Sequence, residues 1–105
     1  GVICETKNGN YKNSKQIKKN INLINSLFYK GYHIKLFTAR FMGRTNDNKV
    51  LAKKKAKILT INQLKKWKVQ YSSIHFGKIS YDLFIDDKSL FFKKNWTQYL
   101  KKKLV

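Results

Sequence analysis

The stretch that decides the fold is GYHIKLFTAR, Gly31 to Arg40. Ile34, Leu36 and Phe37 form a short apolar run that is typical of a strand buried on both faces, and we predict that the strand ends near Thr38. A strand buried on both faces needs helices on both sides of its sheet, so the flanking segments should be helical.

The segment before this strand, Lys15 to Lys30, is predicted to be an amphipathic helix. Its apolar residues lie at spacings of four, three, three and one, which places them on one helical face: Ile17, Ile21, Ile24, Leu27 and Phe28. Asn13 or Ser14 can cap its start, and Gly31 suits its end.

The segment after the strand is predicted to contain two helices. A polar loop, Met42 to Asn48, leads into a first helix over residues 49–59 that carries a thin apolar stripe. Thr60 to Gln63 has the pattern of a capping box, which predicts that a fresh short helix begins there and continues through Trp67.

Two further strands and a last helix complete the chain. We expect strands at Tyr71 to Phe76 and at Tyr81 to Asp86, and a final helix capped by Ser89. That helix carries Leu90, Phe91, Trp96, Tyr99 and Leu100.

The alternation of helices with short apolar strands predicts the fold class. We expect one α/β domain over residues 1–105, a Rossmann-like parallel sheet with helices on both faces and no sizeable cap domain. Ligands bind such sheets at the carboxyl ends of the strands. Three polar groups fall at predicted carboxyl ends, Thr38-Ala39-Arg40, Gly77-Lys78 and Asp86-Asp87, so the sequence predicts one shared site.

The composition is strongly basic. The formal net charge is +19, and the 24 basic residues comprise Arg40, Arg44 and 22 lysines. A genome rich in A/T codons is the simpler explanation, because Lys, Asn, Ile and Tyr are all abundant, but a face that binds polyanions stays open. The apolar runs are too short to span a membrane, and Cys4 is the single cysteine, which favours a cytoplasmic location.

The residues of the predicted site suit phosphate chemistry. Thr38 and the backbone amides beyond it can hydrogen-bond a phosphate oxygen, and Lys78 can neutralise phosphate charge. Asp86 and Asp87 offer hard oxygen ligands for Mg²⁺. Each feature has a simpler reading: Thr38 as a turn residue, Lys78 as one lysine of many, and the paired aspartates as a helix cap.

In that order, GVIC, KLFTAR and GKISYDLFIDDKSL resemble the motifs of the haloacid dehalogenase (HAD) superfamily of phosphatases, in particular small capless members of the capsular-polysaccharide and polynucleotide-kinase types. The resemblance covers nearly the whole chain. It implies that Thr38, Ala39, Arg40 and Lys78 bind phosphate, with Thr38 and Lys78 catalytic, and that Asp86 and Asp87 hold Mg²⁺. It also implies a small phosphorylated substrate, such as a sugar phosphate or a nucleotide, or a nucleic-acid end.

The family's first motif is D-x-D-G, whose aspartates are the nucleophile and the general acid and base. Gly1 matches the glycine of this motif, so both aspartates are absent from the sequence, and we expect a chain that lacks its first strand and hydrolyses little or nothing by itself. The alternative is a basic nucleic-acid-binding module that keeps the HAD-like fold without catalysis.

Overall fold

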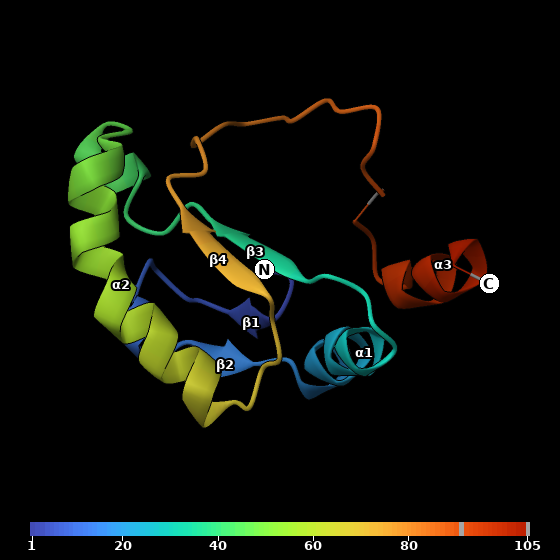
Figure 1. Ribbon diagram of the computed structural model, residues 1–105. Coiled ribbons are helices and arrows are strands. Elements are labelled where there is room, and N and C mark those ends of the chain that lie inside the picture. Colours follow the sequence, from blue (N-terminus) through green and yellow to red (C-terminus); the bar gives the residue numbers. More distant parts are fainter. Residues whose placement is uncertain (91, 105) are drawn as a thin grey trace.

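The fold is built around a strand–helix–strand unit (Figure 1). We describe a computed structural model of the chain, which covers residues 1–90 and 92–104. Its helices and strands, in chain order, are β1 Cys4–Glu5, β2 Lys15–Gln16, α1 Lys18–Tyr29, β3 Lys35–Thr38, α2 Lys49–Lys66, β4 Ser73–Phe76 and α3 Trp96–Lys103. Two short 3-10 turns lie at Tyr11–Asn13 and Gly43–Thr45. The chain is therefore an α/β protein.

Strands β3 and β4 pair in parallel, in the register Lys35↔Ser73 to Thr38↔Phe76. The predicted end of the first strand at Thr38 is confirmed. The prediction that this strand is buried on both faces is wrong, because Phe37 is 59% exposed while Leu36 packs against the core. Only one face of the pair is covered here, so the side chains of β3 alternate between half-buried and exposed.

The core lies between that covered face and the helices. Ile21 of α1, Leu64 of α2 and Val69 form its buried centre. The half-buried residues packed around them are Ile3, Leu36, Trp67, Tyr71 and Ile74. The predicted apolar face of α1 is therefore confirmed in part: Ile21 is buried, its other four residues are half-buried, and the helix also buries Asn20 and Leu23.

The start of α1 differs from the prediction because a hairpin takes the residues before it. Strands β1 and β2 pair antiparallel, with Cys4 opposite Gln16, so Lys15 and Gln16 are extended and the helix begins at Lys18. Ile17 occupies the N-cap position without a side-chain hydrogen bond, so neither Asn13 nor Ser14 caps the helix. At the other end Gly31 has φ 96° and its N–H donates to Phe28 O (3.0 Å), which confirms its role in ending the helix.

Helix α2 is continuous, and the predicted break at Thr60 is wrong. Its start is capped by Asn48, whose Oδ1 accepts from Leu51 N at 3.1 Å. The side chains of Thr60 and Gln63 are buried and both accept hydrogen bonds from the Arg40 guanidinium. These tertiary contacts use the polar groups that a capping box would need, and the backbone continues as a helix through them.

The third predicted strand, Tyr81 to Asp86, is not a strand in the structure. Leu83 and Ile85 are 80% and 89% exposed, and the segment leaves the end of β4 as an arc that reaches α3 (Figure 1). Within residues 1–90 and 92–104, β4 is the strand that pairs with β3, so the arc finds no backbone partner. The parallel pair is therefore the part of the predicted Rossmann-like sheet that the structure contains.

The last helix is shorter than predicted. It begins at Trp96 with Asn95 at the N-cap position, and Ser89 donates its hydroxyl proton to Asp86 O (3.0 Å) instead of capping a helix. Leu90 precedes the helix, and Phe91 lies outside the described residues. In the described part of the chain, no helix combines the length and the hydropathy needed to cross a bilayer.

Candidate functional site

The carboxyl ends of β3 and β4 bring Thr38 and Lys78 together. The backbone N–H of Lys78 donates to Thr38 O at 3.1 Å, which extends the parallel pairing by one bond beyond β4. Gly77 makes this connection with φ 89°, a conformation that side-chain-bearing residues adopt only with strain. Two of the predicted polar groups are thus neighbours at one edge of the sheet.

The Thr38 hydroxyl is oriented by the turn that follows it. Its oxygen accepts from Arg40 N at 3.1 Å, and the side chain is half-buried. A hydroxyl has one proton to donate in addition to its lone pairs. Because the backbone contact uses a lone pair, the Thr38 proton can still be donated to an anionic oxygen at the end of β3.

Lys78 places its ammonium group over an aromatic ring. Its Nζ lies 5.7 Å from the centroid of the Tyr81 ring, an attractive arrangement for a cation. Tyr81 itself packs on Phe84, with their centroids 5.1 Å apart. The Tyr81 ring therefore holds the Lys78 ammonium group on the segment that follows β4.

Asp47 connects the loop after β3 to the segment after β4. It was not among the site residues predicted from the sequence. Its Oδ1 accepts from Ser80 N at 3.1 Å, which ties the loop after β3 to the segment after β4. Asn46 and Asp47 both have positive φ (52° and 60°), a conformation that Asn and Asp tolerate better than most residues. The sequence TNDN, rich in turn formers, is the signal that could have found it.

The Arg40 guanidinium is hydrogen-bonded to side chains of other elements of the protein. Its Nη1 donates to Gln63 Oε1 (2.6 Å) and Thr60 Oγ1 (3.2 Å) of α2, and its Nη2 contacts the Cys4 sulfur (3.5 Å) and Ser14 Oγ (3.4 Å). The guanidinium carbon also lies 5.1 Å from the centroid of the Tyr11 ring. Arg40 thus links the β1–β2 hairpin to α2, a structural role that its position after Thr38 did not indicate.

Asp86 and Asp87 lie in the exposed arc, where the contacts of Asp86 are local. Its Oδ1 accepts from Lys88 N at 3.0 Å, and the Lys88 backbone N–H, followed by the Asp87 side chain, lowers the pKa of the Asp86 carboxyl. No hydrogen bond of the described residues joins either aspartate to Thr38 or Lys78. Both aspartates therefore lie in the exposed arc, and the hydrogen bonds of Asp86 stay within its own turn.

The aspartate pair suits Mg²⁺ by chemistry but does not form a closed site. Mg²⁺ normally takes one or two carboxylates and completes its shell with waters and substrate phosphate. Asp86 and Asp87 can supply two such oxygen ligands, both exposed. Across residues 1–90 and 92–104, no group of three His, Cys, Asp or Glu side chains is arranged to hold a metal ion.

The fold is shared with a solved structure. A crystal structure of a target protein from Vibrio cholerae superposes on the chain with a TM-score of 0.79 at 20% sequence identity, and the match covers 100% of this chain and 93% of the other. No protein-family model and no curated protein matches the sequence. At this identity the likeness shows a common fold.

Proposed function

We propose that the chain carries the phosphate-binding and Mg²⁺-binding parts of a phosphomonoester hydrolase of the HAD type, with a Rossmann-like fold. The observation that carries the proposal is the hydrogen bond from Lys78 N to Thr38 O at the carboxyl ends of two parallel strands. It brings a hydroxyl and a lysine from distant parts of the sequence to the edge where such sheets bind ligands.

Each residue has a defined role in this proposal. The Thr38 hydroxyl and the Ala39 backbone amide donate hydrogen bonds to the phosphoryl oxygens, and the Lys78 ammonium neutralises their charge. Asp86 and Asp87, both exposed carboxylates, hold the metal. When bound, Mg²⁺ supplies positive charge to the substrate phosphate.

The arc after β4 has to approach the sheet for this site to close. Strand β3 has an open edge on the side away from β4. A strand added at that edge would offer backbone groups to Tyr81–Asp86, whose exposed Leu83 and Ile85 have the residue types of a buried strand. Pairing of this kind would carry Asp86 and Asp87 to the carboxyl end of the sheet.

The nucleophile of the proposed reaction is not in this sequence, so binding and hydrolysis need separate tests. In the HAD family the two aspartates of D-x-D-G come directly before the glycine that Gly1 matches. For the 105 residues we expect phosphate binding without turnover. The proposed location is the cytoplasm, and the proposed substrates are sugar phosphates, nucleotides or a nucleic-acid end.

The decisive experiment adds a strand ending in D-x-D before Gly1 and measures phosphate release from an aryl phosphate with and without Mg²⁺. We expect magnesium-dependent release, and a loss of about 100-fold in kcat/KM for Thr38→Val or Lys78→Gln, since removing one preorganised donor costs this much in other enzymes. A folded extended chain that releases no phosphate would refute the assignment.

The aspartates are tested by a metal titration of the same extended chain. Asp86→Asn should raise the Mg²⁺ concentration needed for half-maximal activity. Asp82→Asn is the matched control, since Asp82 lies in the same exposed arc and is not a proposed ligand. An unchanged metal requirement in Asp86→Asn would show that the ligand assignment is wrong.

A further inference from the structure

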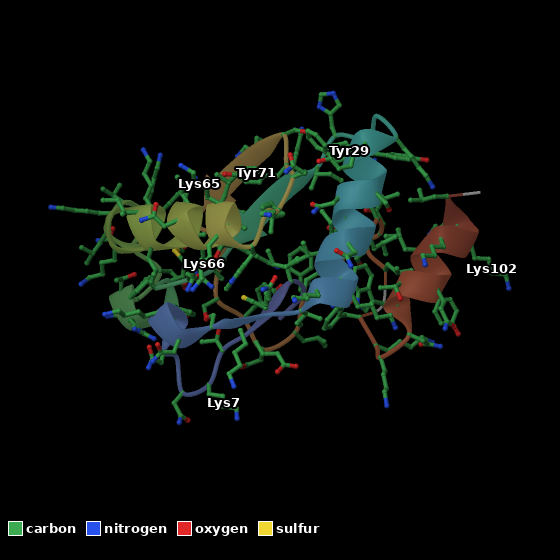
Figure 2. The ribbon with its side chains drawn as sticks, turned by 90° about the horizontal axis from the view of Figure 1, so that it is seen from below. Lys7, Tyr29, Lys65, Lys66, Tyr71 and Lys102 are labelled. Carbon is green, nitrogen blue, oxygen red and sulfur yellow. The ribbon has the colours of Figure 1, made fainter. Side chains whose placement is uncertain are left out.

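A groove lies at the opposite end of the β3–β4 pair from the proposed phosphate site. It has a volume of about 910 Å³ and is bounded by α1, the end of α2 and the link to β4. Three aromatic residues line it, Tyr29, Trp67 and Tyr71, together with Lys18, Lys65, Lys66 and Lys68. Because Tyr71 comes just before β4, the groove lies at the amino end of the strands. Figure 2 shows Tyr29 at the end of α1, and Tyr71, Lys65 and Lys66 around the end of α2.

The floor of the groove is held in place by the protein. Asn25 of α1 donates its Nδ2 proton to Lys68 O (2.9 Å) and accepts from Gln70 N through Oδ1 (2.7 Å). Between these bonds lies Val69, which belongs to the buried core, and Trp67 packs against that core. The turn that carries Trp67 and Tyr71 is therefore fixed before any ligand binds, which lowers the entropy cost of binding.

The charged residues that line the groove are all positive. The five acidic residues of the sequence are Glu5, Asp47, Asp82, Asp86 and Asp87, and none of them lines the groove. Lysines at the end of a helix also complement its dipole, which would account for Lys65 and Lys66 alone. That explanation does not cover Lys18, at the start of α1, or the exposed ring of Tyr29, whereas Trp67 and Tyr71 also pack against the core.

We propose that this groove binds single-stranded nucleic acid. The lysines contact successive phosphates, and the bases stack on the rings of Tyr29, Trp67 and Tyr71. Tyr29 is 73% exposed, so its ring can receive a base that is not already stacked in a duplex. The groove contains lysine and no arginine, which favours contacts to the phosphate backbone without base readout. Binding is therefore independent of the nucleotide sequence and of the proposed phosphatase activity.

The first test is a fluorescence titration of the full chain carrying Trp96→Phe. Trp96 is the other tryptophan and is buried, so this variant leaves Trp67 as the reporter. An oligothymidylate of about ten nucleotides, within the usual site size, should quench Trp67. With four lysines engaged, the logarithm of the binding constant should fall with the logarithm of salt at a slope of about −3. A duplex of equal length should bind more weakly.

Two matched pairs of lysines on α2 test whether the nucleic acid binds in the groove. Lys65→Gln with Lys66→Gln should weaken binding about 25-fold at 0.1 M salt and lower the slope by about 1.4, since each phosphate contact in a single strand contributes about 0.7 to it. Lys54→Gln with Lys55→Gln removes the same charge from α2 outside the groove and should change binding less than about 3-fold. Equal losses in both pairs would show diffuse attraction to a basic surface and overturn the proposal.

An aromatic pair tests the stacking. Tyr29→Ala should weaken binding about tenfold, at the lower end of base–aromatic stacking, and Tyr32→Ala should not. Tyr32 is also exposed and lies outside the groove. If heparin binds as tightly as the oligonucleotide and Tyr29→Ala has no effect, the ligand is another polyanion and the proposal is wrong.

Discussion

Arg40→Ala tests whether Arg40 holds the fold together, as the structure indicates, or is free to serve a ligand. The substitution removes the guanidinium that joins Gln63 and Thr60 of α2 to Cys4 and Ser14 of the hairpin. Gln63 and Thr60 are 8% and 6% exposed, so water replaces the lost partner poorly. We therefore expect a loss of stability.

The size of the loss follows from the two bonds to α2. A hydrogen bond to a charged group contributes about 1.5–3 kcal/mol, and the half-exposed Arg40 places each bond at the lower end. The bond to Gln63 is short (2.6 Å) and the one to Thr60 longer (3.2 Å), which gives a sum of about 2–4 kcal/mol. For a slope of about 1.5 kcal/mol per molar urea, the unfolding midpoint should fall by about 1.3–2.7 M.

The assay is urea unfolding followed by tryptophan fluorescence and by circular dichroism. Arg44→Ala is the control, because Arg44 is the second arginine, is exposed, and contacts the Gly9 carbonyl and the rings of Tyr11 and Phe41. Its loss should cost less than about 1 kcal/mol, as for most exposed positions. Equal midpoints for the two variants would refute the structural role of Arg40.

Three further predictions concern positions elsewhere in the chain. Ala56→Leu should lower the free energy of unfolding by about 1–3 kcal/mol in the same urea assay, because Ala56 is 0% exposed and a larger side chain overpacks the core; an unchanged midpoint would show that α2 is not packed there. Gly77→Ala should cost at least about 1–2 kcal/mol, since φ is 89° and the new methyl would collide with Cγ of Lys49, near the base of that side chain, which would have to shift; a stabilised variant would contradict this backbone conformation. The Asp86 carboxyl should titrate by NMR below the ordinary range of an aspartate, and Lys88→Pro, which removes the donating N–H, should raise its pKa toward that range. Because the pKa is depressed in the folded chain, this contact stabilises the turn at neutral pH and is lost as the pH falls through the lowered pKa.

The two proposed sites lie at opposite ends of the β3–β4 pair. Thr38 and Lys78 lie where β3 and β4 end, and the basic groove lies where they begin. Each site can therefore be removed without touching the other. A nucleic-acid strand held in the groove would also be one source of the phosphorylated ends that the proposed phosphatase could use.

The amino-acid sequence alone determined the elements whose backbone bonds are local or whose apolar pattern is long. The face of α1 and its end at Gly31 followed from spacing and from a residue that tolerates positive φ, and the strands at Leu36 and Ile74 followed from short apolar runs. A helix closes its own hydrogen bonds, so its own sequence carries much of the evidence that it forms, although not for its exact ends. The meeting of Thr38 with Lys78 followed from strand order.

The tertiary structure decided those features that depend on a hydrogen-bond partner elsewhere in the chain. The motif at Thr60 to Gln63 can cap a helix, but the Arg40 guanidinium takes those side chains and α2 continues. Tyr81 to Asp86 has the residues of a strand, but a strand exists only where a neighbour offers N–H and C=O groups, and β3 pairs here with β4. The same reason places Asp86 and Asp87 in an exposed arc: their position depends on a backbone partner that the local sequence cannot specify.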